Sequence, residues 1–278
     1  MKLSEASKPW LGYHRAHSKE NSIRAYQALV ELLDEEFGNV HLEDVTVERI
    51  LPFINRITEG KKPTTKRTRY SHLLAFFNFI KNNIDADFRN PCDTPMLKKL
   101  FRARPSHNWI PLEKETVDEI IFRTAKPRNR LMLELMARGG MRISEVLKLT
   151  PADINDRRLT LKEPKSGKEQ EFIFVLQRLA ERFKDYIKAK GVRPHERVFP
   201  IGYEAAREMV ANAGNVVGIH LRPHDLRRHA ATYASRSGVP IEIISKVILR
   251  HANLSTTERY LGKISDTEAM RWIDNLYA

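Results

Sequence analysis

The chain has 278 residues, with 48 Lys and Arg against 35 Asp and Glu, so it carries a formal net charge of +13. Hydrophobic residues make up 41% of the sequence, which excludes a disordered protein, and the length favours two domains. The single cysteine, Cys92, excludes an intramolecular disulfide and a zinc site built from several thiols.

The charge and the absence of long apolar segments narrow the class of protein. No run of about 18 apolar residues occurs, and the N-terminal residues MKLSEASKPW lack the apolar core of a signal peptide. We therefore expect a cytoplasmic protein with no membrane partner. The pI of about 9.8 favours a polyanionic partner such as nucleic acid, although charge alone does not separate this from a merely basic surface.

The first third of the chain is predicted to be a small all-helical domain, residues 1–90. Apolar residues recur there at helical spacing. The aromatic cluster Phe76, Phe77 and Phe79 fits a hydrophobic core better than a base-stacking surface. Helices are predicted over 20–37, 46–58 and 64–82.

A basic band follows, and it continues into an expected linker. Four prolines between 88 and 111 interrupt regular structure, so residues 91–111 are predicted to be a linker. Residues 60–104 carry 11 basic and 3 acidic side chains. Their basic side chains are candidate contacts to DNA phosphates, and a solvated linker is the alternative for those after residue 90. The candidates are Lys61, Lys62, Lys66, Arg67, Arg69, Lys98, Lys99, Arg102 and Arg104.

The second domain is predicted over residues 112–278. Two runs of β-favouring residues, 158–163 and 170–176, flank a Pro/Ser/Gly turn and predict a hairpin. The remaining pattern is helical. The fold class is therefore mainly α with a small antiparallel β-sheet (α+β). Helices are predicted over 114–124, 128–138, 143–149, 177–190, 203–213, 225–237 and 240–249, and from Ser255.

The motifs for bound nucleotides and metals are absent. The sequence contains no P-loop spacing, calcium loop or zinc helix, so neither a metal nor a cofactor is expected. Groups that can hold and attack a phosphodiester stand instead at helix starts, in a hairpin and in a loop. Each has a structural explanation when taken alone: Arg142 could pair with Glu145, and Tyr260 could be a half-buried phenol. The candidates are Arg142, Lys165, His224, Arg227, His251 and Tyr260.

Three segments that hold these residues resemble the signature blocks of the tyrosine recombinases, the phage integrase and Xer-like family. The hairpin lies between the first two blocks, where that family carries its catalytic lysine. The resemblance covers roughly 112–270, and over about 18–90 the chain looks like the family's helical, SAM-like core-binding domain. The segments are RGGMRISEVLKL at 138–149, HDLRRHAAT at 224–232 and LRHANLSTTERYL at 249–261.

The resemblance implies a site-specific DNA recombinase that cleaves and rejoins duplex DNA through a 3′-phosphotyrosyl intermediate, without metal or ATP. Tyr260 matches the nucleophile, and Arg142 and Arg227 match the two phosphate-clamping arginines. Of the two hairpin lysines, Lys165 and Lys168, the first precedes the Ser-Gly turn and is assigned as the general acid.

The resemblance also assigns the histidines and exposes two departures from the family's pattern. His224 would assist proton transfer at the phenol, and His251 would stabilise charge on the phosphate. Family members often have Gly before the second histidine, where this chain has Arg250, which is expected to contact DNA or to be a surface charge. They often have H-x-L-R-H, whereas here Arg228 follows Arg227 and His229 comes one place later.

Partners and alternatives follow from the same resemblance. Family members act as tetramers on DNA, and accessory DNA-bending or regulatory proteins are expected partners. The C-terminal residues 264–278 carry an apolar stripe that would pack either on a neighbouring subunit or on its own domain. A DNA-relaxing enzyme of the type IB topoisomerase kind and a non-catalytic DNA-binding protein are the alternative functions.

Overall fold

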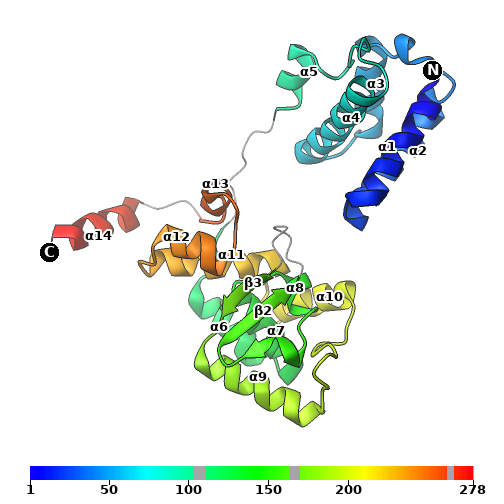
Figure 1. The fold of residues 1–278 in the computed structure, drawn as a ribbon. Helices are drawn as coiled ribbons and strands as arrows, with labels where there is room; N and C mark the ends of the chain where they lie inside the picture. Colours follow the sequence, from blue (N-terminus) through cyan, green and yellow to red (C-terminus); the bar gives the residue numbers. More distant parts are fainter. Residues whose placement is uncertain (103–109, 163–169, 262–265, 278) are drawn as a thin grey trace. The chain divides into compact units, whose positions relative to one another are not determined.

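The computed structural model describes residues 1–102, 110–162, 170–261 and 266–277, which form helices and one small antiparallel sheet (Figure 1). This confirms the predicted fold class. The chain divides into two compact units, residues 1–106 and 107–278. Within the described ranges, no helix is long and apolar enough to cross a membrane.

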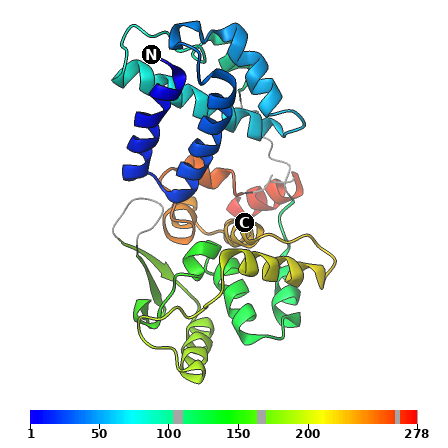
Figure 2. The same cartoon turned by 90° about the vertical axis from the view of Figure 1, so that its right-hand side faces the viewer.

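The first unit is a helical bundle around an aromatic core. Its long helix α4 contacts α1, α2 and α3, and α1 lies beside α2 (Figure 2). Trp10, Phe76 and Phe77 are almost completely buried, so the predicted core role of the aromatic cluster is confirmed. The helices are α1 (Leu3–His17), α2 (Glu20–Phe37), α3 (Val47–Ile57), α4 (Pro63–Asn83) and α5 (Pro95–Leu100), with a 3-10 turn at Leu42–Asp44.

Helix α1 is absent from the sequence prediction, although it supplies part of this core. Pro9 lies inside it, and an internal proline removes a helical hydrogen bond, which speaks against a helix from sequence alone. Leu3, Ala6 and Trp10 nevertheless share the buried face, and the Trp10 ring packs on Phe76 with centroids 5.0 Å apart. Tertiary packing therefore outweighs the local cost of the proline.

The prediction that the linker begins at residue 91 is wrong. Pro95 begins helix α5, and the Thr94 side chain caps it by accepting from the Leu97 backbone N–H at 3.2 Å. Cys92, Leu97 and Phe101 belong to the core of the first unit. The proline here starts a helix, where its missing N–H costs nothing, so residues up to 101 belong to the first unit. Residues 103–109, with Arg104, lie outside the described residues.

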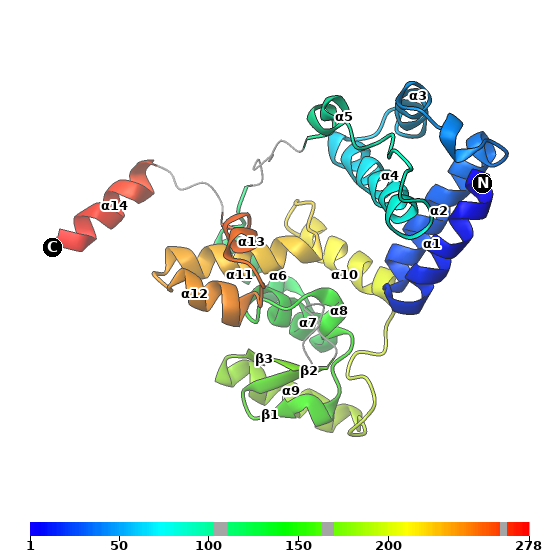
Figure 3. The same ribbon diagram turned by 45° about the horizontal axis from the view of Figure 1, so that its top comes forward.

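The second unit is built around α7, whose residues from Leu131 to Ala137 are all buried. Helix α7 lies between α11 and α9 (Figures 1 and 3). The elements before the sheet are α6 (Lys114–Arg123), α7 (Pro127–Ala137), α8 (Ile143–Val146) and a 3-10 turn at Pro151–Asp153. After the sheet come α9 (Gln177–Lys190), α10 (Tyr203–Asn215), α11 (Pro223–Arg236), α12 (Ile241–Ile243), a π-helix at Ile244–Ile248, α13 (Leu254–Glu258) and α14 (Asp266–Tyr277).

The sheet has the strand order β1-β2-β3 with antiparallel pairing. Its strands are β1 (Ile154–Asn155), β2 (Arg158–Lys162) and β3 (Gln170–Phe174), so the predicted hairpin is confirmed. On β3 the side chains of Glu171 and Ile173 are buried, whereas Phe172 and Phe174 face outward. The carboxylate on the buried face therefore needs a partner inside the unit. The hairpin residues 163–169, with Lys165, are not among those described.

The packing of α5 can be tested with two neighbouring residues. Leu97→Ala should lower the free energy of unfolding of the first unit by about 2–4 kcal/mol, because it empties a fully buried site. Met96→Ala is the control, since Met96 is 53% exposed, and it should change stability by less than about 0.5 kcal/mol. Urea unfolding would be followed by Trp10 fluorescence after Trp109→Phe and Trp272→Phe. Equal effects of the two alanine variants would contradict the packing of α5.

Candidate active site

A buried arginine on α11 organises the candidate site. Arg227 has no exposed surface, and its two terminal nitrogens donate to the backbone carbonyls of Gly140 and Leu249. Nη2 also lies 3.5 Å from Nε2 of His251. Burial, together with the neighbouring guanidinium groups of Arg142 and Arg250, lowers the pKa of Arg227 to about 10, so the side chain is still cationic at neutral pH.

The loop between α7 and α8 reaches Arg227 because it contains a glycine. Gly140 has a φ of +60°, and a Cβ there would lie 2.8 Å from both Cγ2 and the carbonyl oxygen of Ile248. Only glycine combines this backbone conformation with so close an approach. The Gly140 carbonyl is thereby presented to the arginine.

The segment that carries the Leu249 carbonyl, the second acceptor for Arg227, differs from the continuous helix predicted over 240–249. A short α-helix passes into the π-helix Ile244–Ile248, whose wider turn ends where Leu249 N–H donates to the Ile244 carbonyl at 2.8 Å. The next bond joins the His251 N–H to the Ser245 carbonyl at 2.9 Å. Widened turns of this kind are frequent at functional sites, and this one directs the Leu249 carbonyl to Arg227.

Arg142 precedes α8 and is held by Glu145. The Arg142 backbone N–H donates to Oε2 of Glu145 at 2.8 Å, and its Nη1 donates to Oε1 at 2.5 Å. The ion pair weighed as a structural explanation is therefore present. About a quarter of the Arg142 side chain stays exposed, and within the described parts of the chain its guanidinium makes no other hydrogen bond, so it can still bind an anion.

His251 is fixed by a chain of hydroxyl groups. The Thr257 hydroxyl donates to Oγ of Ser245 at 2.8 Å and accepts from Nδ1 of His251 at 3.0 Å. Nε2 is then the lone-pair nitrogen that faces Arg227. Burial, with Arg227 and Arg142 as the largest charged contributors, lowers the pKa of His251 to about 4.

The phenol of Tyr260 lies against His224. Tyr260 Oη is 2.6 Å from Nε2 of His224, and the Tyr260 ring also packs on the His251 ring with centroids 4.8 Å apart. Tyr260 follows the end of α13, whereas the sequence predicts it inside a helix. Thr232 on α11 donates to the Tyr260 carbonyl at 3.0 Å. Helix α11 therefore contacts the backbone of Tyr260 through Thr232 and its phenol through His224.

His224 is set up to accept a proton. It is the second residue of α11, whose N-cap is Arg222, so His224 is not the cap. Partial burial of its ring, followed by the guanidinium groups of Arg228 and Arg227, lowers the pKa of His224 to about 4. The imidazole is therefore neutral at pH 7, as a base for the phenol requires.

The structure brings five of the six predicted site residues together, from α8, α11 and the segment that follows α12. The sixth, Lys165, lies outside the described residues. His229 turns away from this cluster, and its Nδ1 contacts the Leu112 carbonyl at 2.8 Å. The predicted basic band lies in the other unit, where Lys98 pairs with Asp93.

Sequence reasoning considered Glu145 as a partner of Arg142, but it missed two other residues that hold this cluster in place, Thr232 and Thr257. Thr232 and Thr257 carry no signal in the sequence, because their partners lie 28 and 6 residues away.

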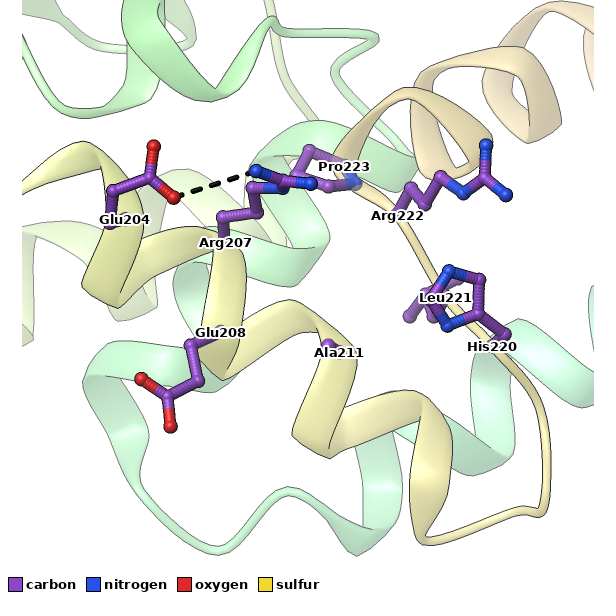
Figure 4. Close-up of a pocket in the computed structure, with 8 residues that line it drawn as sticks. All are labelled: Glu204, Arg207, Glu208, Ala211, His220, Leu221, Arg222 and Pro223. Carbon is purple, nitrogen blue, oxygen red and sulfur yellow. Dashed lines mark hydrogen bonds and ion pairs between the residues drawn. The ribbon is translucent and has the colours of Figure 1, made fainter. Parts of the chain in front are cut away.

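A pocket of about 310 Å³ beside the start of α11 was also missed (Figure 4). Helix α10 contributes Arg207, which pairs with Glu204 at 3.5 Å. His220 and Arg222 come from the segment that leads into α11, and Arg222 stands two residues before His224. Two arginines and two glutamates line the pocket, so its charges largely balance.

Comparisons with known proteins show which sequences this chain is similar to. The phage integrase family matches residues 112–265, which is more than half of the chain. A tyrosine recombinase of Pseudothermotoga lettingae is 29% identical over 249 residues, which cover 86% of this chain and 85% of the relative. The tyrosine recombinase XerA of Pyrococcus horikoshii is 31% identical over 254 residues, covering 87% and 82%.

Solved structures share the fold. The Tn1549 transposon integrase in complex with transposon right end DNA has a TM-score of 0.78 at 17% identity, with both chains fully covered. A lambda integrase dimer bound to a COC′ core site has a TM-score of 0.72 at 17% identity, covering 94% of this chain and 95% of that one. By its sequence matches, with its fold in agreement, the chain belongs to the phage integrase family, the tyrosine recombinases.

Proposed function

We propose that this chain cleaves and rejoins duplex DNA at a specific site, with Tyr260 as the nucleophile. The observation that carries the assignment is the 2.6 Å contact between the Tyr260 phenol and the His224 imidazole, beside a cluster of guanidinium groups. A phenol next to a neutral base and several cations can attack a phosphodiester.

The proposed first step transfers one DNA strand to the protein. The phenol oxygen attacks the scissile phosphorus while His224 takes the phenolic proton. The P–O5′ bond breaks, which leaves a 3′-phosphotyrosyl link, and the leaving 5′-oxygen takes a proton from Lys165. A 5′-hydroxyl from another strand then reverses the same steps, so the energy of the broken bond is conserved without ATP.

The phosphate would be held by Arg142, Arg227 and His251. Arg142 presents exposed N–H groups and Arg227 a buried positive charge, and guanidinium groups match non-bridging phosphate oxygens. His251 is neutral in the free protein because burial and the nearby guanidiniums disfavour its protonation. A bound phosphate offsets that positive charge, so we expect His251 to gain a proton at Nε2 and to donate a hydrogen bond from this N–H to the phosphate.

The first unit would serve as the core-binding domain, with the basic start of α4 as its contact to DNA. Its first turn contains no acidic residue, and Lys61, Lys62 and Arg67 are exposed. Cations at a helix N-terminus oppose the helix dipole by about 0.3–1 kcal/mol each. A phosphate of the DNA backbone would relieve this repulsion.

Self-association on DNA would use α14. Within this helix Met270 is 66% exposed and Ile273 57% exposed, which leaves apolar surface without a partner in the described chain. We propose that this stripe packs on a neighbouring subunit in a tetramer. Accessory DNA-bending or regulatory proteins remain expected partners.

Covalent capture on randomised DNA tests the nucleophile and selects the target sequence in the same experiment. Nicked duplexes with a randomised central sequence would be incubated with the protein in EDTA, and adducts that survive SDS would be recovered and sequenced. The wild-type chain should form adducts, and Tyr260→Phe should form none, because the attacking oxygen is removed. Tyr233→Phe, on the exposed side of α11, is the control and should behave as wild type. Adducts with Tyr260→Phe, or a strict need for Mg²⁺, would refute the mechanism.

The pH response of His224 tests its role as base. Because the folded-state pKa is lowered to about 4, the ring should stay unprotonated as pH falls through 6.5 and gain its proton only near pH 4. NMR titration of the DNA-free protein measures this, and loss of the resonance in His224→Gln assigns it. Arg228→Gln should raise the pKa, because it removes a nearby positive charge. Titration of wild-type His224 near 6.5 would speak against a neutral base.

The salt dependence of DNA binding tests the basic start of α4. Lys61→Gln with Lys62→Gln should reduce the slope of log K against log[salt] by up to about 2, one for each lost phosphate contact. Lys188→Gln with Lys190→Gln is the charge-matched control at the end of α9, and its slope should match wild type. Equal slopes for all three proteins would mean that Lys61 and Lys62 do not contact DNA and are ordinary solvated residues.

A further inference from the structure

Arg250 is buried, contrary to the expectation of a DNA contact or a surface charge. It is 6% exposed and directly precedes His251 at the end of the π-helix segment. Burial of a guanidinium group is unfavourable unless the charge is paired. The position therefore requires an explanation inside the protein.

The backbone of Arg250 adds a second unusual feature. Its φ is +53°, a left-handed conformation that glycine adopts freely and that a residue with a Cβ adopts at a cost. A side chain is kept in such a conformation when the surrounding structure over-determines it. A left-handed residue commonly ends a helix, so the guanidinium contacts are what can explain why an arginine stands here.

The guanidinium group joins three parts of the second unit. Nη2 donates to Oε2 of Glu145 at 2.8 Å, and Nη1 donates to the Ile248 carbonyl at 2.7 Å. Nε lies 3.8 Å from Oε2 of Glu171, the inward carboxylate on β3. Arg250 thus links the carboxylate that holds Arg142 with the buried carboxylate of the hairpin strand.

The shared carboxylate is electrostatically dependent on Arg250. Burial by itself would raise the pKa of Glu145, but Arg250, followed by the backbone N–H and guanidinium of Arg142, brings the pKa below its usual value. Arg250 is thus the largest single contributor that keeps Glu145 ionised. Arg227 adds a smaller contribution of the same sign.

We propose that Arg250 is a positioning residue, which shares the Glu145 carboxylate with Arg142 so that Arg142 is oriented but not fully neutralised, and which links this network to Glu171 on β3. The inference rests on the proposed function, because it concerns how Arg142 meets the phosphate. Without Arg250, Glu145 either pairs with Arg142 alone, or takes up a proton and no longer holds Arg142. Both outcomes misplace the phosphate-binding guanidinium.

The decisive variant is Arg250→Gly, because glycine suits the positive φ and the substitution removes the guanidinium. Its rate of adduct formation on the nicked duplexes selected by the wild-type chain should fall about 10- to 100-fold. Arg250→Lys restores the charge without the fork of N–H groups and should recover part of the rate. Glu171→Gln should slow the reaction less, since it leaves the bond between Arg250 and Glu145 intact.

The pH profile separates positioning from a general loss of structure. In Arg250→Gly, Glu145 keeps its burial but loses its main cation, so its pKa rises and protonation begins at higher pH. The acid limb of the rate should move to higher pH than in wild type. The charged groups around Glu145 are Arg142, Arg227 and Arg250. His224 and His251 also lie near this network, so the pH profiles of His224→Gln and His251→Gln show which part of the acid limb comes from each histidine.

A DNA-free measurement completes the test. In Arg250→Gly, Glu145 stays buried but loses its largest cationic contributor, so its folded-state pKa rises relative to wild type. The stability deficit relative to wild type, measured by urea unfolding, should then grow as pH rises from 5 to 8. A wild-type rate and pH profile in Arg250→Gly, with a pH-independent deficit, would overturn the proposal. Failure of the wild-type chain to form adducts would refute the proposed function instead, and the unfolding series would still decide whether Arg250 keeps Glu145 ionised.

Discussion

The candidate site depends on one interaction, the burial of the Arg227 guanidinium against two backbone carbonyls. Those carbonyls belong to Gly140 and Leu249, which are far apart in the sequence and come from the α7–α8 loop and from the end of the π-helix. A buried cation must be satisfied by acceptors that cannot move away. Arg227 therefore fixes the distance between the two segments that carry Arg142 and His251, and the site takes its shape from that requirement.

The ionic balance of the cluster follows from this arrangement. Arg142, Arg227 and Arg250 face the carboxylates of Glu145 and Glu171, so among the described residues of this cluster one positive charge has no carboxylate partner. Burial, together with the same excess of guanidinium groups, lowers the pKa of both histidines of the candidate site to about 4. A site with this balance disfavours further cations and favours a single negative charge, such as one phosphodiester.

Much of the fold could be predicted from the sequence, because helical periodicity and hairpin signals are local patterns. The residues of the candidate site were indicated by the resemblance of three segments to the signature blocks of the tyrosine recombinases. The rest depends on contacts that no local pattern reports. Hydrophobicity alone would place Phe172 and Phe174 of β3 toward the core, yet Glu171 lies there because Arg250 provides its cation. Arg250 itself was expected at the surface, since a single sequence does not show that a left-handed turn and two buried carboxylates enclose it.

The neutral histidines and the surplus charge together explain how the site is prepared before DNA binds and activated afterwards. In the free protein, burial and the guanidiniums keep the His224 ring unprotonated, so under the proposed mechanism a neutral base already stands beside the Tyr260 phenol. A phosphate that enters the cluster supplies the missing negative charge, which raises the proton affinity of His224 and His251 at the moment when the phenol must lose its proton. The substrate thus completes the charge balance of the site, and the proton acceptor becomes stronger only where a phosphate is present to be attacked.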